Sequence, residues 1–249
     1  MVARTLRCAI PAAALLLFLG GAADQPPEPA PEDRPEPDSD APRPEAVGPG
    51  APHGRHFHGV HGVTFGPDGH LYAGSVVGQA IYRVDPDGGA VELWLEPPLG
   101  MADDLEWSPD GETLVWTAFL LGKVLARTGS AGEIRELASG LPGANSVAWR
   151  EDGRLFATQV FAGDALWELD PAGEREPRRI LAGVGGLNGF DFGPDGRLYG
   201  PLWNKGEVVS VDVDTGEVET VARGFRIPAA VNFDSRGRLW AVDTMAGEV

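Results

Sequence analysis

The stretch FDFGPDGRLYGP (190–201) decides the fold, because the chain carries four further versions of it. Each version reads as a short apolar strand, a tight turn that contains glycine, and a second strand. The other versions are VTFGPDGHLYAG (63–74), LEWSPDGETLVWT (105–117), VAWREDGRLFAT (147–158) and VNFDSRGRLWAV (231–242). Successive turn glycines are 42, 42, 43 and 41 residues apart: Gly69, Gly111, Gly153, Gly196 and Gly237. A nearly constant period with several strands per repeat predicts an all-β fold, the β-propeller.

Each repeat supplies the residues of one four-stranded blade. In the first repeat the expected strands are 63–65, 70–74, 81–84 and 91–95, and Asp-Gly turns allow the positive φ angles that tight hairpins need. One aromatic residue recurs four positions before each turn glycine and is expected to pack between blades: Phe65, Trp107, Trp149, Phe192 and Phe233. We therefore predict a propeller over residues 57–249.

The repeats do not fill a complete ring. About four and a half blades are present, whereas six blades starting near His58 would need roughly 310 residues. An open ring leaves a bare sheet edge. The sequence therefore predicts a C-terminally truncated form of a six-bladed propeller. The alternative is a five-bladed ring closed by an N-terminal strand, for which the proline-rich segment before His58 is poorly suited.

Composition excludes several classes of protein. The 249 residues are 43% hydrophobic, which is enough for a globular core, and carry a formal net charge of −17. Such an acidic chain lacks the basic face that binds nucleic acid or an anionic membrane surface. The one cysteine, Cys8, excludes an intrachain disulfide and a zinc site built on cysteine pairs. No nucleotide-binding loop or serine-hydrolase nucleophile motif is present.

The N-terminal region predicts export. Residues 1–23 combine a positively charged start, a short apolar run and closing small residues, which is the pattern of a cleaved signal peptide. The alternative, a membrane anchor, is disfavoured because the run is shorter than the roughly 20 residues that span a bilayer. Residues 24–56 are rich in proline and acids and predict a disordered linker. We expect a secreted or periplasmic protein with no membrane span after signal removal.

Five positions are expected at one mouth of the propeller channel, because each lies eight residues before a turn glycine. This mouth ring consists of His61, Asp103, Asn145, Asn188 and Ala229. Converging carboxylate and amide oxygens suit a hard cation such as calcium, whereas a histidine favours a transition metal. The alternative is that the Asn and Asp side chains cap their own turns. The ring thus predicts a small-molecule or metal site.

The histidines form a second candidate feature, because all five lie between His53 and His70. His58 and His61 could line the channel as general base and polarising group, since histidine titrates near neutral pH. The alternatives are a metal site made by His56, His58 and His61, or an ordered loop without chemistry.

Two acids follow Asp103 along the expected inner strand. Asp104 and Glu106 are two residues apart and are expected to point the same way in an extended strand. Such a pair suits either acid–base work or hydrogen bonding between blades.

The repeats, with LNGFDFGPDGRLYG (187–200) and PAAVNFDSRGRLWAVDT (228–244), resemble the gluconolactonase and senescence-marker-protein family of six-bladed propellers. The chain is also similar to NHL-repeat and strictosidine-synthase-like propellers. The resemblance covers about 57–249. It implies one divalent cation, usually calcium, at the channel mouth. It also implies hydrolysis of lactones or related esters, in which the metal polarises the carbonyl and a carboxylate or histidine activates water.

The resemblance also assigns roles to residues. Asn188, in Leu187-Asn188-Gly189, matches the family's metal-binding asparagine, and Asn145 matches the asparagine one blade earlier. His61 stands where the family has a metal-binding glutamate. Ala229 stands where the family has the aspartate that binds the metal and is the supposed base, and Asp103 could replace part of the lost charge.

Three functions remain open from the sequence. The first is an exported lactonase-like hydrolase with a modified site, with His61 and Asp103 as catalytic residues and Asp103, Asn145, Asn188 and His61 as metal ligands. The second is a non-catalytic propeller that binds a small molecule or protein partner at the channel mouth. The third is an interaction module displayed on the acidic linker.

Overall fold

The computed structural model describes residues 59–249 of the chain. The predicted signal peptide, the predicted linker and the side chains of His53, His56 and His58 lie outside the described residues, so those predictions stay predictions.

Five antiparallel sheets follow one another along the chain, and within each the strands pair in sequence order. Blade 1 contains β1 (Val60–Phe65), β2 (Leu71–Ser75), β3 (Ala80–Val84) and β4 (Val91–Leu95). Blade 2 contains β5 (Ala102–Trp107), β6 (Thr113–Ala118), β7 (Lys123–Thr128) and β8 (Ile134–Ala138), with the short 3-10 helix η2 (Phe119–Leu121) after β6. Blade 3 contains β9 (Ala144–Trp149), β10 (Leu155–Gln159), β11 (Ala165–Leu169) and β12 (Arg178–Ala182).

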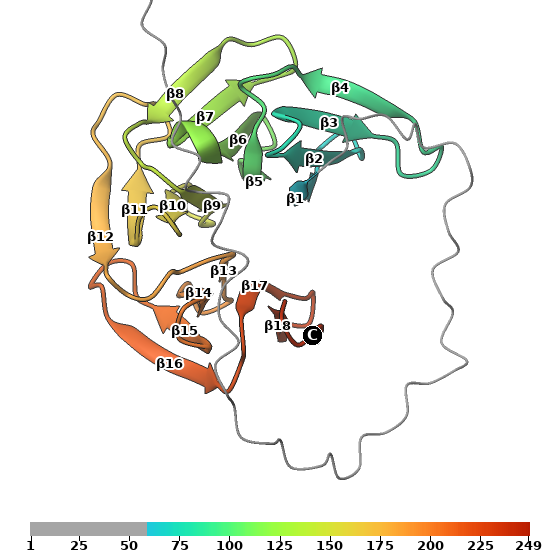
Figure 1. Cartoon of the computed structure of the whole chain (residues 1–249). Coiled ribbons are helices and arrows are strands. Elements are labelled where there is room, and N and C mark those ends of the chain that lie inside the picture. The colour runs from blue at the N-terminus through green and yellow to red at the C-terminus, as the bar shows by residue number, and fades with distance from the viewer. Residues whose placement is uncertain (1–58) are drawn as a thin grey trace, which may run out of the picture. The chain divides into compact units, whose positions relative to one another are not determined.

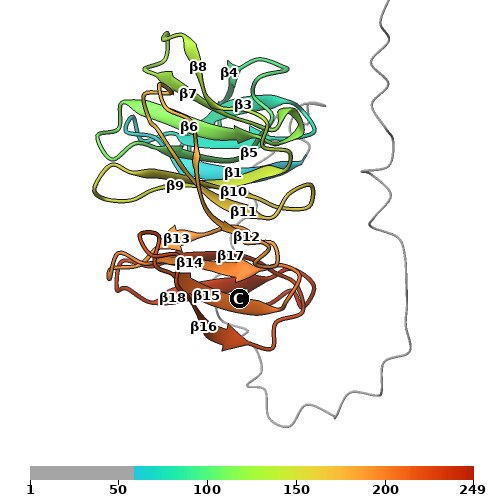
Figure 2. The same cartoon turned by 90° about the vertical axis from the view of Figure 1, so that its left-hand side faces the viewer.

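The fourth and fifth blades complete the described part of the chain. Blade 4 contains β13 (Asp191–Phe192), β14 (Leu198–Leu202), β15 (Glu207–Val211) and β16 (Val218–Arg223), and blade 5 contains β17 (Pro228–Phe233) and β18 (Leu239–Asp243). The first strands of the blades lie toward a common centre and the fourth strands lie outside (Figure 1). Seen from the side, blades 1 and 2 overlap at the top of the view, blade 3 lies below them, and blade 4 lies at the bottom (Figure 2). The predicted all-β propeller of about four and a half blades is confirmed.

The tight turns form as the repeat predicts. In blade 4 the amide of Gly196 donates to the carbonyl of Gly193 over 2.9 Å. Gly196 has a φ of 76°, which an L-residue with a side chain rarely adopts. The Asp195 carboxylate accepts the amide of Arg197 over 3.1 Å and so fixes the turn from inside.

The core lies between neighbouring blades. Leu105 and Trp116 of blade 2 pack with Tyr72 and Ile81 of blade 1 in one buried cluster. The repeated aromatic position contributes edge contacts between blades: Tyr72 with Trp107 at 5.1 Å and Tyr199 with Phe233 at 5.1 Å between ring centroids. Burial of apolar surface at each junction therefore holds the blades in order.

One member of the aromatic set does not pack as predicted. Phe65 is 65% exposed. The repeated aromatic residue packs against the preceding blade, and within residues 59–249 no blade precedes blade 1. Phe65 was expected to pack between blades, and that expectation is wrong for this junction. Within residues 59–249 the structure also contains no helix of the length and hydropathy that crossing a bilayer requires.

Candidate functional site at the channel mouth

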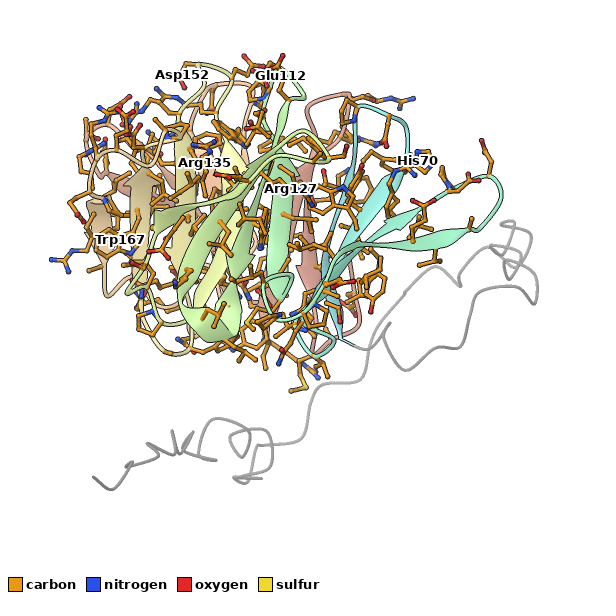
Figure 3. All side chains as sticks on the ribbon, turned by 90° about the horizontal axis from the view of Figure 1, so that it is seen from above. His70, Glu112, Arg127, Arg135, Asp152 and Trp167 are labelled. Carbon is orange, nitrogen blue, oxygen red and sulfur yellow. The ribbon has the colours of Figure 1, made fainter. Side chains whose placement is uncertain are left out.

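The inner strands bring the mouth ring to one end of the molecule. His61, Asp103, Asn145 and Ala229 lie in β1, β5, β9 and β17, and Asn188 lies shortly before β13. Neighbouring inner strands pack side by side, as β1 with β5 and β5 with β9. The tight turns lie at the opposite end of the strands, where Figure 3 shows Glu112 and Asp152 along the same end. Because the residues of the mouth ring are equally spaced from the turn glycines, they lie at a similar depth in the channel.

Three members of the ring form a continuous hydrogen-bonded chain across three blades. His61 Nδ1 lies 2.6 Å from Asp103 Oδ1, and Asn145 Nδ2 donates to Asp103 Oδ2 over 2.5 Å. The hydroxyl of Ser146 donates to Asn145 Oδ1 over 3.0 Å, which fixes the orientation of the amide. We call His61, Asp103 and Asn145 the His–Asp–Asn chain.

The pairing gives His61 the properties of a base. Its Nδ1 is held by Asp103, so Nε2 is the nitrogen left to take a proton from a ligand or water. The side chain of His61 is 48% exposed, whereas that of Asp103 is 12% exposed. The hydrogen bond to Asp103 raises the pKa of His61 above its usual value of 6.5, although partial burial opposes this.

The other two ring members are not joined to this chain. Asn188 Oδ1 accepts the amide of its own neighbour Gly189 over 2.9 Å, and that amide also donates to the carbonyl of Ala229 over 3.0 Å. Asn188 therefore caps local backbone at the junction of blades 4 and 5, which is the alternative that the sequence left open for such residues. Ala229 presents only a methyl group.

Thr117 is a buried residue that supports the His–Asp–Asn chain, and it was not among the residues predicted from the sequence. Its hydroxyl lies in the core with no exposed surface, donates to the carbonyl of Asn145 over 2.5 Å and accepts the amide of Asp104 over 3.0 Å. It therefore joins the inner strands of blades 2 and 3 immediately beside the ring. A lone hydroxyl among aliphatic and aromatic neighbours in LVWTA (114–118) is the sequence signal that identifies it.

Replacing Thr117 with valine is expected to lower the free energy of unfolding by about 1–3 kcal/mol. The valine keeps the shape of threonine but leaves the buried amide of Asp104 without an acceptor. Urea unfolding measures the effect. Thr113→Val is the matched control, because the hydroxyl of Thr113 meets Thr128 at the surface. Equal stability of the two variants would contradict this role of Thr117.

The side chains of Asp104 and Glu106 accept hydrogen bonds between blades 2 and 3 and do not face the channel mouth. Asp104 Oδ2 accepts the amide of Val147 over 3.1 Å, and Glu106 Oε2 accepts the amide of Trp149 over 2.8 Å. Both acceptors therefore cap amides of β9, as expected for two side chains on one side of a strand. Of the two roles predicted from sequence, the geometry supports hydrogen bonding between blades.

Burial changes the ionisation of both acids. It raises the pKa of Asp104 to about 7, with a further contribution from the charge of Asp103. It raises the pKa of Glu106 to about 8, and the nearby charges of Asp104 and Asp191 add to the rise. Asp191 makes the same kind of contact at the junction of blades 4 and 5, where its Oδ2 accepts the amide of Phe233 over 2.9 Å. Burial between blades 2 and 3 thus favours the neutral forms of Asp104 and Glu106.

The side-chain oxygens of the mouth ring, as they are arranged, do not fit calcium. Calcium takes about six to eight oxygen ligands. Here both oxygens of Asp103 accept hydrogen bonds, the amide oxygen of Asn145 accepts one from Ser146, and that of Asn188 caps Gly189. Within residues 59–249 no three His, Cys, Asp or Glu side chains group together as metal ligands. The predicted calcium site stays a prediction.

Two cavities lie at the opposite end, among the tight turns. Their volumes are about 430 and 720 Å³. Carboxylates that line them are used within the protein: Asp234 accepts the amide of Arg236 and pairs with Arg238 at 2.7 Å, and Asp152 pairs with Arg150. The channel mouth therefore remains the better candidate, because no group of residues 59–249 pairs with His61 Nε2 there.

Comparison with known proteins shows the fold. No known protein family matches the sequence, and no curated protein matches it. A virginiamycin B lyase from Staphylococcus aureus has a similar structure, with a TM-score of 0.63, 17% identity, and coverage of 74% of this chain and 63% of the lyase. A chain of a nidogen/laminin complex gives a TM-score of 0.65 at 19% identity, with coverage of 74% and 72%. A putative gluconolactonase gives 0.62 at 17% identity, with coverage of 73% and 70%.

These similarities support a β-propeller and nothing finer. The chain spans about three fifths of the length of the lyase, 63%. The three proteins have unrelated names, and identities below 20% do not carry an activity from one propeller to another. Structural similarity to a putative gluconolactonase is consistent with the resemblance seen in the sequence, without assigning the chain to that family.

Proposed function

We propose that the channel mouth is the active site of an exported hydrolase that opens lactones or cleaves related esters. His61 is the general base in this proposal, and Asp103 is its orienting partner. The observation that carries it is the 2.6 Å contact between His61 Nδ1 and Asp103 Oδ1 at an otherwise accessible channel end. A histidine oriented by a carboxylate is the arrangement that activates water in many hydrolases.

The reaction follows from this arrangement. His61 Nε2 accepts a proton from water while the water oxygen attacks the carbonyl carbon of the ester. Asp103 stabilises the resulting imidazolium, and Asn145 holds the second oxygen of Asp103 in place. The C–O bond of the ester then breaks, and His61 returns the proton to the departing alkoxide, so that an acid and an alcohol form.

The experiment is a screen of the purified chain with small lactones and uncharged esters, followed by a pH profile. The active form of His61 is neutral, so turnover is expected to rise with pH through a pKa above 6.5. No turnover of any lactone or ester would contradict the proposal. A profile that falls over the same range would contradict His61 as the base.

Metal removal tests the predicted calcium site directly. We expect turnover and thermal stability to be unchanged by a chelator, because the ring oxygens already accept hydrogen bonds within the protein. Turnover is measured after chelation and again after calcium is added back. Loss of activity that only calcium restores would overturn the metal-free mechanism and support calcium binding by Asp103, Asn145 and Asn188.

A second function is favoured by the other half of the ring. Ala229 and the self-capped Asn188 offer no reactive group toward the axis, which suits a propeller that binds a ligand without transforming it. In that case ligands raise the melting temperature without turnover. Melts with the same lactone panel separate the two functions.

A further inference from the structure

Apolar side chains surround the polar mouth ring. They lie in the segments that follow the second strand of each blade, and we call them the apolar rim: Val77, Phe119, Leu120, Phe161, Trp203 and Met245. Val77 is 68% exposed, Leu120 61% and Met245 62%. The tight turns at the other end of the strands carry aspartate instead, as at Asp68 and Asp152. Apolar exposure at the loops is therefore a property of the mouth end.

Backbone hydrogen bonds join the rim to the ring. The amide of Val160 donates to the carbonyl of Gly143 over 2.8 Å, and the amide of Trp203 donates to that of Gly186 over 2.9 Å. Gly143 and Gly186 lie two residues before Asn145 and Asn188. Blades 1 and 5 repeat the contact through the pairs Val76 with Gly59 and Thr244 with Ile227. The same bond in four blades fixes the rim at the same end of the channel as His61.

Three rings of the rim form a strip across blades 2 to 4. Phe161 contacts Phe119 at 6.3 Å and Trp203 at 5.2 Å between ring centroids, in edge-to-face arrangements. Edge-to-face contacts of this kind favour fixed ring orientations. The strip is a preformed apolar surface rather than a set of independent side chains.

The backbone of Phe161 is strained. Its φ is 67°, a region that a residue other than glycine, Asn or Asp adopts at a cost of about 1 kcal/mol or more. The phenyl group gains little from burial in return, because it is 58% exposed. A strained backbone that presents an exposed aromatic ring beside a candidate site points to ligand contact.

We propose that the apolar rim binds the aryl or alkyl substituent of the substrate, which makes the substrate an uncharged, lipophilic lactone or ester. This inference rests on the proposed hydrolase function. The formal charge of −17 adds to it, because an acidic protein repels anionic substrates. The strip then holds the substituent while the ester group reaches His61.

The test compares γ-butyrolactone with γ-phenyl-γ-butyrolactone. Binding is measured by calorimetry in the His61→Gln background, so that hydrolysis does not interfere, and turnover is measured in the unmodified chain. We expect the phenyl lactone to bind about tenfold more tightly than the unsubstituted one. Phe161→Asn is expected to remove most of that difference, since it deletes the ring contact.

Stability separates a ligand contact from a structural role. Asn tolerates the positive φ of residue 161, so Phe161→Asn is expected to keep or raise the melting temperature. Leu93→Ala is the control, because Leu93 is 49% exposed on the outer strand β4, and it should leave the preference for the phenyl lactone unchanged.

Each outcome bears on one claim. Equal binding of the two lactones, or a preference that survives Phe161→Asn, would overturn the rim as a substrate site even if lactones are hydrolysed. A large drop in melting temperature for Phe161→Asn, or self-association of the chain that this change abolishes, would overturn it in favour of a structural or interface role. Tight binding of the phenyl lactone without any turnover would support the rim and contradict the hydrolase.

Discussion

Asp103→Asn is expected to lower kcat for lactone hydrolysis by about 10³- to 10⁴-fold. The substitution removes the charge that stabilises protonated His61. The new asparagine has only one side-chain oxygen, so it cannot accept hydrogen bonds from both His61 and Asn145 through separate oxygens as Asp103 does. The pKa of His61 should fall with the loss of the hydrogen bond that raises it. Steady-state kinetics across the pH range measure both effects.

The control for this prediction is Asp152→Asn. Asp152 is an aspartate of a tight turn at the opposite end, paired with Arg150, and its replacement should leave kcat within twofold. Activity of Asp103→Asn at more than half of the unmodified rate would show that His61 works without its partner. A similar loss in both variants would indicate damage to the fold.

Glu106→Gln is expected to stabilise the protein at high pH and to change little at low pH. In the folded protein the pKa of Glu106 is raised from 4.5 to about 8, chiefly by burial. A raised pKa favours the protonated form, so the stabilisation is complete below about pH 4.5 and is lost as the pH rises through about 8. Ionisation at about pH 9 costs on the order of 4 kcal/mol.

Glutamine removes this cost and keeps the contact. The side-chain oxygen of glutamine can still accept a hydrogen bond from the backbone amide of Trp149, which donates to Glu106 Oε2 in the unmodified protein. Urea unfolding at about pH 4 and pH 9 therefore compares the two proteins where the difference is small and where it is large. Asp104, whose pKa is raised to about 7, is present in both proteins, and its charge accounts for only a minor part of the raised pKa of Glu106. Parallel pH curves would contradict a buried, neutral Glu106.

The fold was predictable because the repeat is local. A turn such as Gly193-Pro194-Asp195-Gly196 specifies a hairpin by its own residues, and the period then specifies the blades. The mouth ring followed from the same register, which is why His61, Asp103 and Asn145 meet. The exposure of Phe65 could not be deduced, because it depends on what packs beside blade 1.

The features that sequence reasoning missed depend on contacts between blades. The strained backbone of Phe161 has no signature in the repeat. The hydroxyl of Thr117 stands out only as a polar residue in an apolar strand, and its partner on the inner strand of the next blade does not follow from the repeat. The self-capping of Asn188 was foreseen only as one alternative. Whether a polar residue faces a ligand or its own backbone is decided by local geometry that spacing does not contain.

The central claim, that His61 and Asp103 act as a pair, is tested most directly by the NMR titration of His61, which needs no substrate. The signal is assigned by its absence in His61→Gln. The account predicts a pKa above the ordinary 6.5, with a return toward that value in Asp103→Asn. An ordinary pKa in the unmodified protein, unchanged by Asp103→Asn, would contradict the pairing and with it the proposed base.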